Sequence, residues 1–288
     1  MKSTPQNGFS IANGDEPEFP VLLSVPHSGR DYPSDLKNNL RIPANDLLRL
    51  EDRYADLLVG KAKNSGFPVI QAHKPRAWID LNRAEDDIDA GMLIGVPAGR
   101  SFSVSAKQRG GLGLIPRRLS GAGDVWKRPF SYDDIHHRIT SFHRPYHNAI
   151  GDMLAQIRAK FGLAILIDIH SMPPVKETAR SPVPSFVVGD RFGGSAAGRF
   201  AEMILAHIEA AGHICSLNHP YAGDHILRQH GQPRRDIHAV QLEIDRSLYL
   251  DSALREPAGG VDAISSLILE IVDTIADAVG GAQLLAAE

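Results

Sequence analysis

Several short segments of this chain are apolar through almost their whole length, and they set the fold class. Residues 164–169, with the sequence AILIDI, are the clearest case, because only Asp168 interrupts the apolar run. A strand with one solvent-facing side alternates apolar and polar residues, whereas a strand buried on both sides does not. Such strands need helices on both faces of their sheet, so we expect an α/β protein.

Segments with helical periodicity alternate with these strands. Strands are predicted over residues 68–73, 77–82, 164–169 and 185–190, in residues 20–29 before a polar loop, and within residues 238–249 before a polar end. Helices are predicted over residues 43–66, 131–162, 195–212 and 264–279. Pro145 falls inside the second helix, so a kink or two helices are expected there. Gly280 and Gly281 predict the end of the last helix.

The rest of the chain predicts an arm and a long loop. Residues 1–19 are polar and rich in turn formers, so we expect a loose N-terminal arm followed by one α/β domain over residues 20–288. Residues 84–130 hold many Gly, Arg and Ser residues with little periodicity, which predicts an irregular excursion. Long loops in compact domains are often functional, and this one is expected to shape a pocket.

Composition narrows the function classes. A formal charge of -3 gives no electrostatic reason to expect nucleic acid or a membrane surface as a partner. Cys215 is the single cysteine, which excludes an internal disulfide and a cysteine-rich zinc site. The N-terminal residues lack the apolar core of a signal peptide, and no run approaches the ~20 apolar residues of a membrane span. We therefore expect a cytoplasmic enzyme with a small-molecule substrate.

Polar residues follow several predicted strands at their carboxyl ends, the edge at which open α/β sheets bind ligands. They are His27, Asp80, Asn82, Arg83, Asp168, His170, Glu243, Asp245 and Arg246. A polar residue at any one strand end is ordinary, because strand ends meet solvent. Their coincidence at four strands favours a site.

His27 and His170 fit a catalytic zinc site, which commonly takes three nitrogen or oxygen ligands from the protein. The segment LEDRYADL offers Glu51, Asp52 and Asp56 as the third ligand. On a helix Glu51 and Asp52 point about 100° apart, whereas Asp52 and Asp56 share a face. The residues alone leave this choice open, as they do the alternative of solvated helix charges. Iron, cobalt or manganese could occupy such a site too.

Two further carboxylates have candidate roles. Asp168 stands two residues before His170, so it could orient that ring or face a helix N-terminus. Glu243 lies between Leu242 and Ile244, and burial in so apolar a setting should raise its pKa. A general base working near neutral pH needs such a shift. A buried structural ion pair is the alternative for Glu243.

Other motifs are weaker evidence for a functional site. His143 and His147 stand four residues apart in HRPYH, the spacing of a helical metal pair. No Glu follows His143 in the HExxH pattern and Pro145 disturbs the turn, so a structural or substrate-contact role is predicted. The serine-hydrolase elbow GxSxG, a complete dinucleotide-binding glycine pattern and a P-loop are absent from the sequence.

The motifs SVPHSGRDYP, IDLNR, DIHSMP, DRFG and QLEIDRSLY, in this order, resemble the N-formylglutamate amidohydrolase (N-formylglutamate deformylase) family. The resemblance covers roughly residues 20–250. This family is related to the zinc carboxypeptidases, aspartoacylase and succinylglutamate desuccinylase. The resemblance implies a three-layer fold of the phosphorylase/hydrolase-like kind, with a mixed, mostly parallel sheet between helices and one zinc at the strand ends.

The resemblance also implies the metal ligands. PHSG places His27 as the first ligand, and DIHS places His170 as the last. In the carboxypeptidase relatives a Glu stands three residues after the first ligand, but Arg30 occupies that position here. The carboxylate must then come from LEDRYADL, where we choose Asp52 and keep Glu51 in reserve.

The remaining roles follow in the same way. QLEI places Glu243 as the general acid and base, and DLNR places Asn82 and Arg83 on the substrate carboxylate. A guanidinium suits that task because it takes a carboxylate in two parallel hydrogen bonds. Candidates for the oxyanion or a second carboxylate are Arg76, Arg109 and Arg117.

The implied reaction is zinc-dependent hydrolysis of N-formyl-L-glutamate to formate and L-glutamate, a step of histidine degradation. Glu243 would take the proton of the attacking water and return it to the leaving amine. Two alternatives stay open: the same site acting on another N-acyl amino acid or amide, and a non-catalytic ligand-binding homologue. The sequence does not specify the acyl group, the native metal or the oligomeric state.

Overall fold

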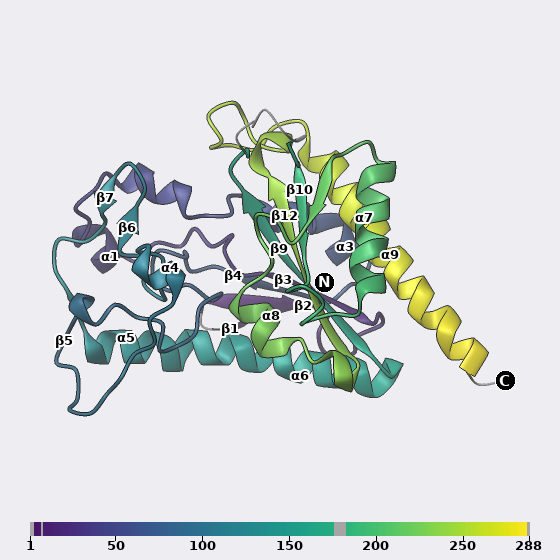
Figure 1. Ribbon diagram of the computed structural model, residues 1–288, viewed down its shortest axis with the longest axis horizontal. Coiled ribbons are helices and arrows are strands. Elements are labelled where there is room, and N and C mark those ends of the chain that lie inside the picture. Colours follow the sequence, from purple (N-terminus) through teal and green to yellow (C-terminus); the bar gives the residue numbers. More distant parts are fainter. Residues whose placement is uncertain (1–2, 7, 176–182, 287–288) are drawn as a thin grey trace.

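The computed structural model describes residues 3–6, 8–175 and 183–286, and one sheet runs through it (Figure 1). The sheet has eight strands in the order β1-β2-β4-β3-β9-β12-β10-β11. These are β1 Ser3–Gln6, β2 Phe9–Ala12, β3 Val21–Val25, β4 Val69–Ala72, β9 Ala164–Met172, β10 Phe186–Gly189, β11 Cys215–Leu217 and β12 Ile237–Asp245. Neighbours β4, β3, β9 and β12 are parallel, whereas β2 and β10 run antiparallel to them. The mixed, mostly parallel sheet is confirmed.

Helices cover both faces of this sheet, which confirms the α/β class. The helices are α1 Ser34–Asn38, α2 Ala55–Leu58, α3 Gly60–Asn64, α4 Ala106–Arg109, α5 Tyr132–Arg138, α6 Arg144–Phe161, α7 Gly198–Ala210, α8 His225–His230 and α9 Val261–Ala286. Helices α6 and α8 pack on one face, and α2, α3, α7 and α9 gather on the other. Figure 1 shows α6 running along one side of the strands, with α7 and α9 on the opposite side. None of the described helices is long and apolar enough to cross a bilayer.

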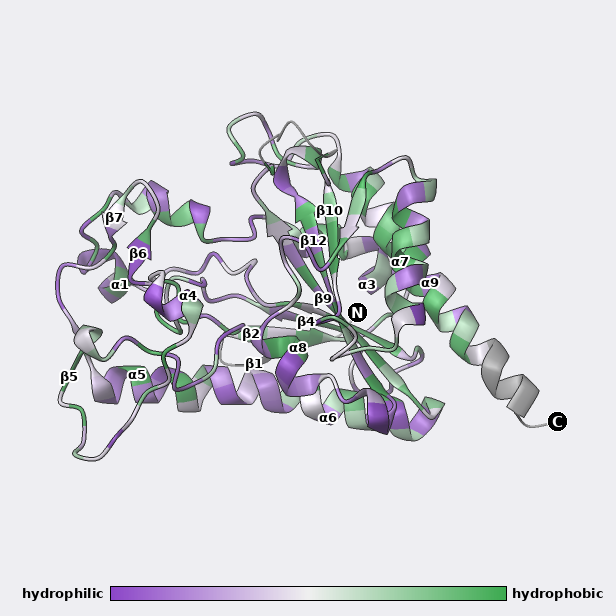
Figure 2. Ribbon diagram, in the orientation of Figure 1, coloured by the Kyte–Doolittle hydropathy of each residue, from purple (hydrophilic) through white to green (hydrophobic). Residues whose placement is uncertain are grey.

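The surroundings of strand β9 explain why its sequence is almost entirely apolar. All nine of its residues are buried. Ala164 and Leu166 join the core under α6, whereas Ile165, Ile167 and Ile169 join the core under α7 and α9. Figure 2 shows apolar strands at the centre of the molecule. Burying each large apolar side chain stabilises the fold by about 1.5–3 kcal/mol, so both layers hold this strand in place.

Strand β9 is longer than the sequence predicted. We expected it to end at Ile169, but it continues to Met172 because β12 pairs with it as far as Asp245. His170 therefore lies within the strand, directly beside Glu243 on β12. The paired neighbour fixes both side chains on the same face of the sheet.

The prediction of one helix over residues 43–66 is wrong. A 3-10 helix, Ala44–Arg49, is followed by a non-helical break and then by α2 and α3. Tyr54 has a left-handed backbone with φ 57°, and the N–H of Asp52 donates to the carbonyl of His27 over 3.0 Å. This hydrogen bond to the loop after β3 replaces the one that the N–H of Asp52 would make within a regular helix.

The prediction of a strand over residues 77–82 is also wrong. This segment is buried, but the side chain of Asp80 accepts a hydrogen bond from the backbone N–H of Asn82 over 2.8 Å and closes a turn. The backbone N–H of Asp80 donates to Leu114 over 2.8 Å. Its apolar residues are therefore covered by the excursion rather than by sheet neighbours.

Both chain ends differ from expectation. The prediction of a loose arm over residues 1–19 is wrong where β2 forms. This strand pairs antiparallel with β4 and buries Phe9 completely. The end of the last helix predicted at Gly280 is wrong as well, because α9 runs to Ala286. Whether residues 20–288 form one domain is untested and stays a prediction.

The helical run over residues 131–162 is interrupted ahead of Pro145, as expected. Helix α5 passes into a π-helical turn, Ile139–His143, and then into α6. Proline has no N–H for the preceding turn, and a wider turn accommodates that loss. Figure 1 shows α5 and α6 end to end along the lower side of the molecule.

Residues 84–130 form the irregular excursion that was predicted. Its strands are β5 Leu93–Ile94, β6 Arg118–Leu119 and β7 Gly123–Asp124, and β5 pairs with β8 Phe130–Ser131 just beyond it. The excursion lies to one side of the main sheet, above α5 (Figure 1). The predictions over 68–73, 185–190, 195–212 and 238–249 are confirmed as β4, β10, α7 and β12.

Candidate active site

His27, Asp52 and His170 meet at the carboxyl edge of the parallel strands. One potential ligand atom of each lies within 4.8 Å of the other two. His27 follows β3, His170 lies in β9, and Asp52 occupies the break ahead of α2. The side chains are almost fully buried. The structure thus brings the three predicted metal-site residues together, although Asp52 comes from a break rather than from a helix.

Asp52 is the acidic residue of its segment that faces the histidines. Its Oδ2 lies 2.9 Å from Nδ1 of His170 and 3.4 Å from Nδ1 of His27. Its other oxygen, Oδ1, accepts from Arg246 over 3.2 Å. One carboxylate oxygen is thus fixed by an arginine, while the other points at both imidazoles.

The two alternatives to Asp52 are engaged elsewhere. Glu51 accepts hydrogen bonds from the Tyr32 hydroxyl and from Arg53. Asp56 pairs with Arg30, with a shortest N–O distance of 2.7 Å. The break in the predicted helix gives these neighbouring carboxylates different surroundings, which the spacing of an unbroken helix could not show.

Each histidine of the site is backed by a second carboxylate. Nε2 of His27 lies 2.7 Å from Oδ1 of Asp80, and Nε2 of His170 lies 2.8 Å from Oδ2 of Asp168. Metal-binding histidines usually donate their second ring N–H in this way, which leaves the other nitrogen for the metal. Here the nitrogens left over are the two Nδ1 atoms that face Asp52.

The donor atoms fit a divalent metal ion. Nδ1 of His27 is buried and has no hydrogen-bond partner among the described residues. A buried polar atom without a partner is costly, and a metal ion would remove that cost. Two imidazole nitrogens and one carboxylate oxygen are a common ligand set for catalytic zinc.

The electrostatics also favour a cation. Burial raises the pKa of Asp52, but the hydrogen bond from His170 and the nearby ring of His27 outweigh it and hold that pKa well below the usual value. Burial lowers the pKa of His170, but Asp168 and Asp52 raise it well above its usual value. A site that holds a proton so strongly stabilises positive charge, which is the property that a metal site needs.

Glu243 lies at the same edge, beside His170. Its Oε1 accepts a hydrogen bond from Nε2 of Gln241 over 2.8 Å. Burial raises the pKa of Glu243, His170 opposes this shift and Asp52 adds to it. The raised pKa predicted from the apolar sequence around Glu243 is confirmed in direction.

A cavity of about 810 Å³ opens over these groups. Its walls include His27, Asp52, His170 and Glu243 together with Arg76, Asn82, Arg83, Tyr221 and Arg246. Lys107, Leu112 and Arg118 bring the excursion to the same cavity. The expectation that residues 84–130 help to shape the pocket is confirmed.

The predicted arginines divide into two groups. Arg76 and Arg83 line the cavity; Nε of Arg76 donates to Asp80 over 2.8 Å. Arg109 lies on the excursion and donates to a carbonyl of its own loop, and Arg117 pairs with Asp89 over 2.8 Å. The structure does not bring Arg109 or Arg117 to the cavity, so the excursion turns them away from the predicted substrate contacts.

Sequence reasoning assigned no role to two wall residues: it named Arg246 only as a polar residue after a strand, and it did not name Tyr221. Arg246 follows β12, the strand that carries Glu243. It donates to Ser171 over 3.0 Å and to Asp52. Its place in QLEIDR was a usable signal. Tyr221 comes from a loop between β11 and α8, and no periodicity or motif marks that loop.

The model of the N-formylglutamate amidohydrolase family matches residues 19–250. The chain belongs to the N-formylglutamate amidohydrolase family. It is 31% identical over 237 residues to an N-formylglutamate deformylase of Pseudomonas putida, covering 81% of this chain and 82% of the relative. It is 28% identical over 265 residues to one of Pseudomonas aeruginosa, covering 89% and 92%.

Two solved structures share the fold, and the first of them is named as a member of the same family. The crystal structure of an N-formylglutamate amidohydrolase from Ralstonia eutropha JMP134 superposes with a TM-score of 0.86 at 29% identity, covering 96% of this chain and 99% of that one. A gene product of Agrobacterium tumefaciens shares the fold, with a TM-score of 0.66 at 18% identity over 95% and 96% of the two chains.

Proposed function

We propose that this protein hydrolyses N-formyl-L-glutamate to formate and L-glutamate. The observation that carries the proposal is the buried His27–Asp52–His170 group beside Glu243, at the base of a cavity walled by arginines. Family membership and the names of the curated relatives support the same substrate. On this proposal the enzyme works in histidine degradation in the cytoplasm.

The proposed cofactor is one divalent metal ion per chain, with zinc as the first choice. Nδ1 of His27, Nδ1 of His170 and Oδ2 of Asp52 would hold it, because these atoms face one another and the remaining ring nitrogens are held by carboxylates. When bound, such an ion supplies a Lewis acid for the amide carbonyl and lowers the pKa of water from 15.7 toward ~7.

Glu243 is proposed as the group that moves the proton. Gln241 holds Oε1, so the proton is taken and returned at Oε2. The raised pKa suits both halves of the task, because the carboxylate must accept a proton from water and then give it to the leaving amine. Glu243 is paired in register with His170 on the adjacent strand, which places its carboxylate at the edge of the sheet that carries the proposed metal ligands.

The substrate carboxylates are assigned to Asn82, Arg83 and Arg76, with Arg246 as an additional cation in the wall. Nε of Arg83 is held by the carbonyl of Leu112 over 2.8 Å, and Nη1 is held by the carbonyl of Asn82 and by Asp224, which leaves Nη2 for the substrate in a fixed plane. A planar fork recognises carboxylates with more geometric selectivity than an ammonium group.

A substrate screen tests this proposal. N-formyl-L-glutamate should give the highest kcat/KM among N-formyl and N-acyl amino acids, with formate and glutamate released in equal amounts. Faster hydrolysis of another N-acyl amino acid would favour the related-amidohydrolase alternative. Saturable binding of N-formyl-L-glutamate without turnover, in metal-loaded protein, would favour the ligand-binding homologue.

A further inference from the structure

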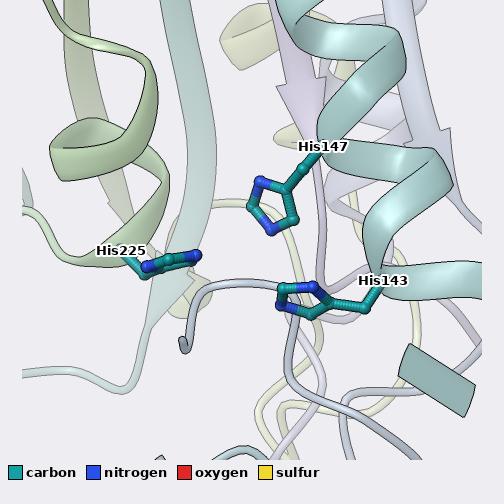
Figure 3. Close-up of side chains that lie close together, drawn as sticks. All are labelled: His143, His147 and His225. Carbon is teal, nitrogen blue, oxygen red and sulfur yellow. The ribbon is translucent and has the colours of Figure 1, made fainter. Parts of the chain in front are cut away.

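Four buried histidines lie behind the cavity wall, between α6 and α8. His143 ends the π-helical turn, His147 follows in the first turns of α6, and His225 and His230 belong to α8. Figure 3 shows the rings of His143, His147 and His225 turned toward a common centre from these different elements. None of these histidines lines the cavity or enters the proposed mechanism.

Two of these rings hold the backbone of the wall. Nε2 of His147 lies 2.9 Å from the carbonyl oxygen of Leu81, and Nε2 of His143 lies 2.8 Å from that of Arg83. A carbonyl oxygen only accepts hydrogen bonds, so each Nε2 carries the hydrogen. The two carbonyls flank Asn82, a residue assigned to the substrate carboxylate.

The hydrogen bonds of His147 to Leu81 and to the ring of His230 fix its tautomer. Burial lowers the pKa of His147 well below its usual value, and burial lowers the pKa of His230 to about 4. Both rings are therefore neutral near pH 7 and carry one N–H each. Because Nε2 of His147 donates to Leu81, its Nδ1 must accept, and Nε2 of His230 lies 2.9 Å away as the donor.

The opposite side of the segment is held by the start of α8. Oδ1 of Asn82 accepts from the backbone N–H of Ile226 over 2.8 Å. A terminal nitrogen of Arg83 donates to Asp224 over 2.7 Å. Residues 81–83, which we call the substrate segment, are thus held through the carbonyls of Leu81 and Arg83 by α6 and the π-helical turn before it. The side chains of Asn82 and Arg83 are held by the start of α8.

The cluster could also be read as a second metal site, because one nitrogen each of His143, His147 and His225 lies within 4.8 Å of the others. Both nitrogens of His147 are already committed, one to Leu81 and one to His230. A metal ion would have to displace one of these hydrogen bonds. The hydrogen bonding therefore favours neutral histidines that hold backbone carbonyls over a metal centre.

We propose that His143 and His147 are positioning residues that hold the substrate segment, so that Asn82 and Arg83 present their side chains to the substrate carboxylate. The inference rests on the proposed function. It requires that loss of either N–H loosens substrate binding more than it slows the chemical step. Glu243 lies on a separate strand, and Asp80, which backs His27, is held by Arg76 and by its own backbone contact with Leu114.

The first test compares Leu and Gln substitutions, assayed with N-formyl-L-glutamate on the metal-loaded protein. His147→Leu and His143→Leu should each raise KM about tenfold, the effect of one buried hydrogen bond, with kcat within about threefold of wild type. His147→Gln and His143→Gln place an amide N–H near the position of Nε2 and should restore most of the affinity. His137→Leu, at an exposed position of α5, is the matched control.

A double-mutant cycle separates positioning from general damage. In the Asn82→Ala background, His147→Leu should raise KM by less than about twofold, because the contact that it positions is already gone. If the Leu variants do not fold, Gln is compared with Asn at the same positions. Asn is too short to reach the Leu81 carbonyl, so it should raise KM where Gln does not.

Several results would overturn the inference. Folded Leu variants with wild-type KM, equal losses in the Gln variants, or full additivity with Asn82→Ala would each refute positioning. A second equivalent of zinc bound by wild type and lost in His143→Leu would show a metal centre instead. A wild-type protein that releases no formate refutes the proposed function. An active wild type with unaffected variants refutes only the positioning role of His143 and His147.

Discussion

At the scale of single residues, the site depends on how each side chain is held rather than on which types are present. His27 and His170 were predictable, because a histidine after a buried strand points to a sheet-edge site. The geometry of Asp168 agrees with the predicted role of orienting His170, over a 2.8 Å contact. The choice between Asp52 and its neighbours needed the structure, since a left-handed residue at Tyr54 ends the helix that spacing assumed.

Removing the carboxylate of the proposed metal site should remove the metal. Asp52→Ala is expected to bind less than one tenth as much zinc after dialysis as wild type, because the remaining histidines offer no anionic ligand. Metal content per chain, measured by elemental analysis, checks this. Asp56→Ala is the control, since Asp56 pairs with Arg30 outside the site, and it should keep its metal. Equal losses in both variants would contradict the assignment.

Removing the proposed base should stop the chemistry and spare the metal. Glu243→Gln keeps the shape of the side chain and the contact with Gln241, yet it cannot accept a proton. We expect kcat to fall about 10²–10⁴-fold, the usual contribution of a positioned base, with zinc content unchanged. Single-turnover kinetics together with metal analysis measure both quantities. Near-wild-type turnover in this variant would refute the role of Glu243.

At the scale of elements, buried strands were predictable and their surroundings were not. The apolar run of β9 predicted a strand correctly, because both of its faces meet helices. The equally apolar residues 77–82 are not a strand, since the excursion buries them and Asp80 closes a turn. A single sequence shows that a segment is buried, but it does not show which element buries it.

The helices that carry the histidine cluster predict a pH dependence of stability. Burial lowers the pKa of His225 to about 3, well below its usual value of 6.5. The unfolded chain therefore binds more protons than the folded one as the pH falls below 6.5, so stability is present above that pH and is lost below it. His225→Gln should flatten the fall in the free energy of unfolding between pH 7 and 5 by about 1–2 kcal/mol. Urea unfolding at both pH values measures this, and an unchanged slope would contradict it.

At the scale of the whole molecule, the active-site cavity lies where the sheet meets the excursion. The parallel strands β3, β9 and β12 bring His27, His170 and Glu243 to one edge, an arrangement indicated by the polar residues at the carboxyl ends of the predicted strands. The excursion closes the cavity with residues that no periodicity marks, and α8 and β11 were too short to leave a pattern. The fold class, the mostly parallel sheet and the family were therefore readable from the sequence, whereas the pocket walls that the excursion and the α8 region supply were not.

Metal binding should also stabilise the whole fold. The proposed ligands come from three separate parts of the chain, so an ion that binds the folded state alone adds stability by mass action. At a free zinc concentration 100 times the Kd, the free energy of unfolding should rise by about 2.7 kcal/mol. Thermal unfolding with zinc and with chelator measures this shift. A melting temperature unaffected by zinc in wild type would contradict a metal site formed only on folding.

The most direct test of the account is formate release from N-formyl-L-glutamate by metal-free protein titrated with zinc. We predict no activity at the start, a linear rise with added zinc and a break at one equivalent per chain, while Asp52→Ala stays inactive throughout. Full activity in the chelator-treated protein, or a titration that Asp52→Ala reproduces, would contradict the metal-dependent mechanism at His27, Asp52 and His170.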